Sequence, residues 1–185
     1  MTIGLTAKIE ELHRSLRTAE LPHAFGGALA LAFCLESPRA TVDIDLNVFI
    51  GVDRVDELVA ALPDAVVVDD TNRGQLVRDA QTRAWWDRTP IDLFLSNHPF
   101  HDRAEANRRT VAFAGIPQLP VLACSDLAVF KAFFARPKDA VDVAAMVAAG
   151  AVDLDALERT VDALLGTEDR RQFLDRVREF VAEQG

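Results

Sequence analysis

Nine residues near the start of the chain decide its fold: Val42-Asp43-Ile44-Asp45-Leu46-Asn47-Val48-Phe49-Ile50. The β-branched and aromatic residues that dominate this run predict a β-strand. Side chains two residues apart in a strand point to the same face, about 7 Å apart along the chain. Asp43 and Asp45 would therefore share one face of the strand, and the apolar residues Val42, Ile44 and Leu46 would fill the other.

Two carboxylates in so apolar a strand are costly to bury unless cations compensate their charge. A divalent cation is the simplest compensation, and Mg²⁺ in particular prefers oxygen ligands. An edge strand whose aspartate face is solvated is the alternative. The pair of aspartates by itself does not decide between these two interpretations.

The overall composition is that of a globular protein with a substantial core. The chain has 185 residues, of which 50% are hydrophobic, and its net charge of -9 argues against a broad basic surface for nucleic acid. No apolar stretch reaches membrane-spanning length, and Met1 to Glu10 lack the features of a signal peptide. Cys34 and Cys124 lie among apolar residues, so we expect buried free thiols in a cytoplasmic protein in preference to a disulfide.

The periodicity of apolar residues predicts an α+β fold, in which helices flank a mixed β-sheet core and a helical extension follows. Short turn segments and prolines separate the predicted elements, and Pro117 and Pro120 mark a change from mixed to helical character. We therefore expect an α/β core over residues 1–118 and a helical region over residues 119–185 packed on it. Helices are predicted at residues 5–19, 28–35, 53–62, 99–109, 125–134, 137–150, 153–165 and 168–181, and strands at 42–50, 65–68, 74–78, 83–87, 91–95 and 111–113.

Two further features lie on either side of the Asp43/Asp45 strand. Gly26 and Gly27 precede a helix, where glycine lets the backbone approach a ligand closely and the helix N-terminus offers free N–H groups to phosphate. A simple tight turn is the alternative. Asp92 is a lone carboxylate in a second apolar strand, and it would join the first pair if the strands are neighbours at about 4.8 Å. Three such carboxylates suit two metal ions about 3.5–4 Å apart, whereas the alternative is a strand-end residue satisfied by backbone N–H groups.

The order of these motifs resembles the signature of the DNA polymerase β-like nucleotidyltransferase superfamily. The matching segments are Phe25-Gly26-Gly27, the following helix, Asp43-Ile44-Asp45-Leu46 and Ile91-Asp92-Leu93. Within that superfamily the chain is most similar to the AbiEii/MenA-type bacterial branch, whose members carry a lysine on a helix followed by a Lys/Arg-Asp-x-x-Asp segment. The stretches that carry this similarity are Gly26-Gly27-Ala28-Leu29-Ala30, Arg39-Ala40-Thr41-Val42-Asp43, Ser125-Asp126-Leu127-Ala128-Val129-Phe130-Lys131 and Arg136-Pro137-Lys138-Asp139-Ala140-Val141-Asp142.

The resemblance, which spans roughly residues 22–148, implies a role for each matching residue. Gly26 and Gly27 would hold the triphosphate of an NTP, and Asp43 and Asp45 would bind Mg²⁺. Asp92 would bind metal or take the proton from the attacking hydroxyl. Lys131 would contact a phosphate, although its side chain could instead reach solvent along the apolar helix. Arg39 and Thr41 would brace the metal site or the phosphates. The chain departs from the family pattern at Gly27, where serine is frequent, and in a longer gap before Asp43.

The resemblance also implies an activity, namely transfer of an NMP from an NTP to an acceptor hydroxyl with two Mg²⁺ ions. The acceptor would be an RNA end or a protein side chain in a toxin-like or defence role, with an antitoxin protein as partner. An acidic chain also suits a small-molecule acceptor such as a cationic aminoglycoside. A non-catalytic member that binds a nucleotide or a partner protein is the third alternative. Adjacent Trp85 and Trp86 would point to opposite faces of a strand, one into the core and the other toward a base or acceptor.

Overall fold

The computed structural model describes residues 3–37, 40–165 and 168–184. The chain divides into two compact units, and each is described by itself. The first unit comprises Met1–Leu29 and Ala40–Leu122, and the second comprises Ala30–Arg39 and Ala123–Gly185. The residues that carry the predicted site fall in both units, because Lys131 belongs to the second and the three aspartates to the first.

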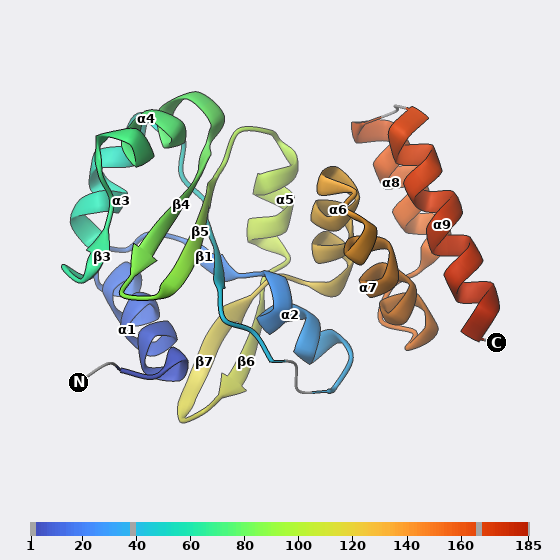
Figure 1. Ribbon diagram of the computed structural model, residues 1–185, viewed down its shortest axis with the longest axis horizontal. Coiled ribbons are helices and arrows are strands. Elements are labelled where there is room, and N and C mark those ends of the chain that lie inside the picture. The colour runs from blue at the N-terminus through green and yellow to red at the C-terminus, as the bar shows by residue number, and fades with distance from the viewer. Residues whose placement is uncertain (1–2, 38–39, 166–167, 185) are drawn as a thin grey trace. The chain divides into compact units, whose positions relative to one another are not determined.

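The first unit is built on one mixed sheet, shown in Figure 1. Its seven described strands lie in the order β3-β4-β5-β2-β1-β7-β6. The neighbours β2/β5 and β1/β7 are parallel, and the other neighbouring pairs are antiparallel. The strands are β1 (His23–Phe25), β2 (Ile44–Val48), β3 (Val66–Val67), β4 (Gln81–Trp86), β5 (Thr89–Leu95), β6 (Arg109–Phe113) and β7 (Ile116–Val121).

The two aspartate-bearing strands β2 and β5 are direct neighbours, as expected from the sequence. One face of these strands is core, because Ile44, Leu46, Ile91 and Leu93 are all at most 3% exposed. The aspartates lie on the opposite face and are only partly covered. Val42 was expected on the core face and that prediction is wrong. The strand begins at Ile44, so Val42 precedes it and is 78% exposed.

Helices cover the sheet of the first unit, and α1 lies beside α3 in Figure 1. Helix α1 is amphipathic, and its apolar residues Ile9, Leu12 and Leu16 are buried. Lys8 is buried with them, and its Nζ donates to the carbonyl of Trp86 at 2.7 Å, which ties α1 to the end of β4. The helices of this unit are α1 (Leu5–Thr18), the short 3₁₀-helix η1 (Val52–Arg54), α3 (Val55–Ala61), α4 (Asp70–Asp79) and α5 (Phe100–Ala106).

The predicted strand at residues 74–78 is wrong, because these residues belong to helix α4. A capping box begins this helix: the backbone N–H of Asn72 donates to the Asp69 carboxylate at 2.8 Å, and the Asp69 N–H donates to the Asn72 side chain at 3.1 Å. Ala80 ends it in the left-handed conformation. The capping signal outweighs the low helix propensity of Gly74 inside the helix.

Two strands at the other side of the sheet were not predicted. β1 has only three residues, and β7 contains both Pro117 and Pro120, which were read as a join between regions. Proline lacks a backbone N–H and therefore signals against a strand. Pairing with neighbouring strands makes this segment a strand despite its prolines. β7 pairs with β1 at one register pair, Phe25 with Val121, and forms a hairpin with β6.

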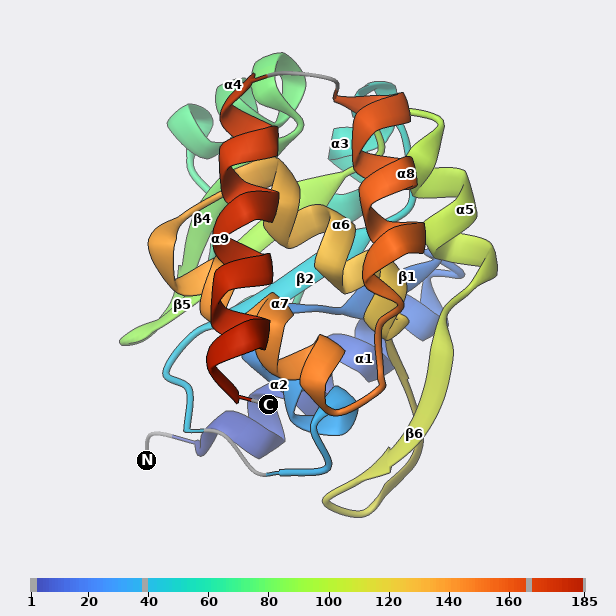
Figure 2. The same ribbon diagram turned by 90° about the vertical axis from the view of Figure 1, so that its right-hand side faces the viewer.

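The second unit is helical, with α8 and α9 side by side and α6 behind them in Figure 2. Helix α2 (Gly27–Cys34) begins in the first unit and ends in the second. Pro137 occupies the first turn of α7, as its sequence position predicts. The remaining helices are α6 (Cys124–Phe134), α7 (Pro137–Ala148), α8 (Leu154–Leu164) and α9 (Glu168–Gln184).

Cys34 and Cys124 form a disulfide within the second unit, so the prediction of free thiols is wrong. The two cysteines are 90 residues apart in the sequence, but the fold brings their Cα atoms to 5.7 Å. That distance lies inside the range a disulfide requires. Both residues are buried, as expected from their apolar neighbours.

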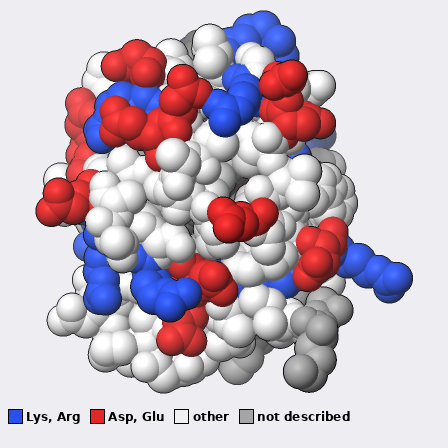
Figure 3. Space-filling view, turned by 90° about the vertical axis from the view of Figure 1, so that its left-hand side faces the viewer, with Lys and Arg blue, Asp and Glu red and all other residues white. Residues whose placement is uncertain are grey.

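Charged side chains of both signs are interspersed on the face drawn in Figure 3, and one acidic group lies in its otherwise mostly uncharged middle. On that face the described lysines and arginines form several small groups and no continuous stripe. Within the described ranges, every helix is too short or too polar to cross a membrane.

Candidate functional site

The Gly26-Gly27 turn packs directly against Asp45. The backbone N–H of Gly26 donates to the carbonyl of Asp45 at 2.9 Å. Gly27 has a positive φ of +51°, and a Cβ placed on it would overlap the Asp45 carboxylate. A Cβ on Gly26 would lie 3.0 Å from the Asn47 amide nitrogen. Glycine at position 27 is therefore required twice, by the backbone conformation and by the space that the carboxylate occupies.

Asp45 and Asp92 are register partners on the parallel strands β2 and β5. Neighbouring strands are about 4.8 Å apart, and partners in register project their side chains to the same face. The pairing Ile44 with Ile91 and Leu46 with Leu93 buries the other face and holds this register. The predicted meeting of the two motifs is therefore confirmed at the level of the backbone.

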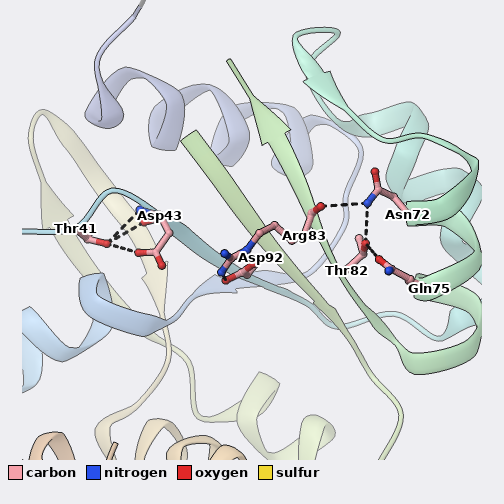
Figure 4. Close-up of polar contacts among 7 residues, drawn as sticks. All are labelled: Thr41, Asp43, Asn72, Gln75, Thr82, Arg83 and Asp92. Carbon is pink, nitrogen blue, oxygen red and sulfur yellow. Dashed lines mark hydrogen bonds and ion pairs between the residues drawn. The ribbon is translucent and has the colours of Figure 1, made fainter. Parts of the chain in front are cut away.

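Asp43 lies just before β2, at the same end of the strand as Asp45. Thr41 Oγ1 donates to a carboxylate oxygen of Asp43 and also lies 3.3 Å from the Asp43 backbone N–H, which donates to it. Figure 4 shows Thr41 and Asp43 facing each other beside the strands that carry Arg83 and Asp92. Thr41 thus orients the Asp43 carboxylate. Arg39, the other residue expected to brace this segment, lies outside the described residues.

Asp92 is engaged by an arginine that sequence analysis did not single out. Arg83 lies opposite Asp92 on β4, and its Nε and Nη2 donate to the two Asp92 carboxylate oxygens at 2.6 and 2.7 Å. The hydrogen bond and charge of Asp92 raise the pKa of Arg83, and the charges of Asp43 and Asp45 add to this effect. Any cation bound to Asp92 is therefore also attracted by the charges of Asp43 and Asp45.

A signal for Arg83 exists in the sequence. Residues Gln81, Arg83 and Trp85 alternate with buried Thr82, Ala84 and Trp86 along β4. This period of two, together with the tight turn to β5, would have placed Arg83 on the aspartate face. The predicted strand began only at residue 83, so the alternation was not recognised. Trp85 lies on that same face and is 46% exposed, whereas Trp86 is buried.

The donor set has the chemistry of a Mg²⁺ site. Asp43, Asp45 and Asp92 offer hard carboxylate oxygens, and Gly27 leaves the room that the Asp45 carboxylate needs. The guanidinium on Asp92 also shows that this position accepts a cation. In the described part of the chain, no three His, Cys, Asp or Glu side chains are grouped as a metal would require. The Asp92 carboxylate points at Arg83 and that of Asp43 at Thr41, and side-chain rotation would be needed to gather them.

Lys131 lies on α6 and ends in a buried ion-pair cluster of the second unit. Its Nζ donates to Asp139 at 3.1 Å and to Asp142 at 2.7 Å, and Lys131 is only 7% exposed. Its side chain therefore does not reach solvent, which was the alternative considered from sequence. Burial acts to raise the pKa of Asp139, but hydrogen bonds and charge from Arg136 and Lys131 outweigh it, so the pKa is lowered.

Comparison with known proteins gives a family match and several matches of fold. A family model described as the nucleotidyl transferase AbiEii toxin of a type IV toxin–antitoxin system matches residues 12–184. Comparison with curated protein sequences found no match.

Among solved structures, ANT(2'')-Ia in complex with adenylyl-2''-tobramycin is similar, with a TM-score of 0.60 at 16% identity, over 92% of this chain and 97% of that chain. An antigenic nucleotidyltransferase-like protein from Paracoccidioides brasiliensis has a TM-score of 0.55 at 15% identity, over 93% and 92% of the two chains. The solution structure of the antibiotic-resistance factor ANT(2'')-Ia has a TM-score of 0.53 at 16% identity, over 97% and 94%.

At such identities the structural matches establish the fold, which is that of the nucleotidyltransferases. The family match covers almost the whole chain, including both glycines, all three aspartates and Lys131. The chain belongs to the AbiEii nucleotidyltransferase family.

Proposed function

We propose that this protein is a Mg²⁺-dependent nucleotidyltransferase that moves an NMP from an NTP to an acceptor hydroxyl. The observation that carries the proposal is the register of Asp45 with Asp92 directly beside the Gly26-Gly27 turn. A metal–triphosphate site is supported by this arrangement, because the carboxylates lie close to backbone N–H groups at the start of a helix. Membership of the AbiEii family supports the same class of reaction.

The triphosphate would lie against the Gly26-Gly27 turn and the first turn of α2. Backbone N–H groups of that first helical turn would donate to phosphate oxygens, whereas the Gly26 N–H already donates to Asp45. The helix dipole favours negative charge at this end. Asp43 and Asp45, with Asp92, would hold two Mg²⁺ ions. Bound there, the ions would compensate the phosphate charge and stabilise the leaving pyrophosphate. Thr41 would keep the Asp43 carboxylate oriented through the hydrogen bond that it makes.

In the reaction, the acceptor oxygen forms a bond to the α-phosphorus as the bond from that phosphorus to the β-phosphate oxygen breaks. Pyrophosphate leaves with the electron pair of the broken bond. The hydroxyl proton would pass to the Asp92 carboxylate, which is partly exposed on the aspartate face of the sheet. Asp92 is then deprotonated by solvent before the next turnover.

We further propose that the acceptor is an RNA end or a protein side chain, and that an antitoxin protein opposes the activity. The description of the family as a toxin of a type IV toxin–antitoxin system supports both points. Trp85, half-exposed two residues from Arg83 on the aspartate face, would offer a flat ring for a base to stack on.

An aminoglycoside-type acceptor is the second candidate, because the chain carries 29 acidic and 20 basic residues. An acidic protein attracts a cationic small molecule and repels the RNA backbone. A non-catalytic member that only binds nucleotide is the third candidate.

The deciding experiment incubates the protein with each of the four α-³²P-labelled NTPs, Mg²⁺ and one acceptor class at a time, namely total RNA, cell protein or an aminoglycoside panel. Label transferred to one class, and lost in an Asp45→Asn variant, supports the proposal and identifies the acceptor class. Absence of transfer to every class, with NTP binding retained, would favour the non-catalytic member.

A further inference from the structure

Arg83 and Asp92 form a two-pronged ion pair on the aspartate face of the sheet. Figure 4 shows the arginine side chain crossing from β4 to β5 and ending on the carboxylate. Both carboxylate oxygens are used, at 2.6 and 2.7 Å, in the two-pronged geometry that arginine makes with carboxylates. Asp92 is therefore already bound by a cation of the protein itself.

The backbone of Arg83 is fixed while its side chain has room to move. The Asn72 amide donates to the Arg83 carbonyl at 3.1 Å and to Thr82 Oγ1 at 2.9 Å, and β4 pairs with β5 along its whole length. The Arg83 side chain is 53% exposed, whereas that of Asp92 is only 18% exposed. The guanidinium can thus rotate into solvent without leaving a void, but the carboxylate cannot turn away as easily.

Arginine and a divalent cation would compete for the same oxygens. A carboxylate that accepts two hydrogen bonds from one guanidinium has no lone pair directed at a second cation on that side. A metal ion that binds the same two lone pairs of Asp92 must displace the arginine, and the lost ion pair then subtracts from the cation affinity.

We propose that Arg83 is a built-in counter-cation, which occupies Asp92 until a divalent cation displaces it and so sets the cation affinity of the site. The inference rests on the proposed function, because it assumes that Asp92 is a metal ligand. In this role Arg83 takes no part in the transfer of the nucleotide and acts only through Asp92. In the absence of metal, the arginine also keeps the adjacent carboxylates from repelling one another.

The test measures Mn²⁺ binding to the full chain without nucleotide, by electron paramagnetic resonance of the free ion. Mn²⁺ alone is the probe, and activity is not the readout. Three variants are compared with the parent protein: Arg83→Gln removes the competitor, Arg83→Lys keeps the charge but loses the two-pronged geometry, and Asp92→Asn removes the ligand. Arg54→Gln is the matched control, because Arg54 makes a similar two-pronged pair with exposed Glu57 beyond the other end of β2.

Arg83→Gln should bind Mn²⁺ roughly two- to fivefold more tightly, the range that loss of a partly exposed ion pair allows. Arg83→Lys should fall between Arg83→Gln and the parent, Arg54→Gln should match the parent, and Asp92→Asn should bind more weakly. Melting curves of each variant establish that it is folded at the temperature of the measurement.

Unchanged or weaker Mn²⁺ binding by folded Arg83→Gln, with clear binding by the parent, would overturn the counter-cation role and leave the proposed function intact. Loss of Mn²⁺ binding in all proteins, the parent included, would instead overturn the metal-dependent function, and the inference with it. A variant Arg83→Gln that does not fold is replaced by Arg83→Lys, for which binding no tighter than the parent's counts against the inference.

Discussion

The backbone of Gly27 packs directly against the carboxylate of Asp45. No side chain fits between them, since a Cβ on Gly27 would overlap the carboxylate group itself. The contact links a turn at the start of α2 to an aspartate in the middle of the sheet. A change at the glycine is therefore a change at the candidate site.

Substitution Gly27→Ala should remove activity and destabilise the fold. The methyl group would displace Asp45, and alanine at a φ of +51° adds strain of about 1 kcal/mol. We expect weaker NTP binding in a thermal-shift titration and a lower melting temperature without nucleotide. Gly74→Ala is the control, because a Cβ there has no atom within 4 Å and the helix α4 favours alanine. Equal melting temperatures and NTP affinities for Gly27→Ala and the parent would contradict the packing argument.

Removal of one carboxylate charge at Asp45 or Asp92 should reduce turnover strongly and leave the fold intact. Asparagine has the same shape, but it is a poorer ligand for Mg²⁺ and no proton acceptor, so we expect a fall in kcat of roughly a hundredfold or more. Circular dichroism checks the fold, and transfer of labelled NMP measures turnover. Asp79→Asn, in an exposed ion pair with Arg78, should keep full activity. Full activity of Asp92→Asn would exclude Asp92 as metal ligand and as base.

The stability of the protein should decrease as the pH is lowered, because a buried histidine pair lies at the start of β1. His23 Nδ1 donates to the Leu21 carbonyl at 2.8 Å, so its Nε2 accepts from His13 Nδ1 at 2.9 Å. Burial lowers the pKa of His23 from 6.5 to about 4, and the charges of His13 and Arg108 act in the same direction. Below pH 6.5, His23 is therefore protonated in the unfolded chain but stays neutral in the folded chain until the pH approaches 4.

This contribution to stability is complete above about pH 6.5 and is lost as the pH falls toward 4, by up to about 3 kcal/mol. Urea unfolding at several pH values between 7 and 4.5 measures it. His23→Gln should flatten the slope of unfolding free energy against pH over this window. His98→Gln is the control variant, since His98 is exposed and lies outside the pair. Identical slopes for His23→Gln and the parent would show that other groups cause the pH dependence.

Reduction of the Cys34–Cys124 disulfide should lower the melting temperature. The bridge closes a loop with a sequence separation of 90 residues, and the entropy model gives at most about 4–5 kcal/mol for such a loop. We expect dithiothreitol to shift the melting curve of the parent downward. A Cys34→Ser/Cys124→Ser double variant should have the melting temperature of the reduced parent, and dithiothreitol should not change it. Insensitivity of the parent to reductant would show that the bridge contributes no stability.

Lys131→Met should destabilise the second unit, whatever its effect on phosphate binding. The variant leaves Asp139, which is 0% exposed, with one cation fewer, and breaking such a buried pair costs about 3–5 kcal/mol. Chemical denaturation measures this loss. Exposed Lys138→Met on the same segment should change stability by less than about 0.5 kcal/mol. A stable Lys131→Met protein with weakened NTP binding would instead support the phosphate role expected from the family resemblance.

The sequence alone determined the elements whose signals are local. Alternation of apolar residues with Asp43, Asp45 and Asp92 located the two strands at the centre of the sheet, and the Gly26-Gly27 pair indicated a turn before a helix. The order of these motifs also indicated the family that the whole-chain match confirms. Each of these signals depends on residues within a few positions of one another.

Tertiary structure decided the rest, because contacts between distant residues have no local signal. The disulfide joins residues 90 positions apart, β7 forms despite two prolines because β1 and β6 pair with it, and a capping box turned a predicted strand into α4. The ion pair of Arg83 with Asp92 depends on the register of β4 against β5. A slip of one residue would turn Arg83 to the opposite face. The sequence thus supplied the carboxylates, and only the folded sheet decided that the Arg83 guanidinium lies on Asp92.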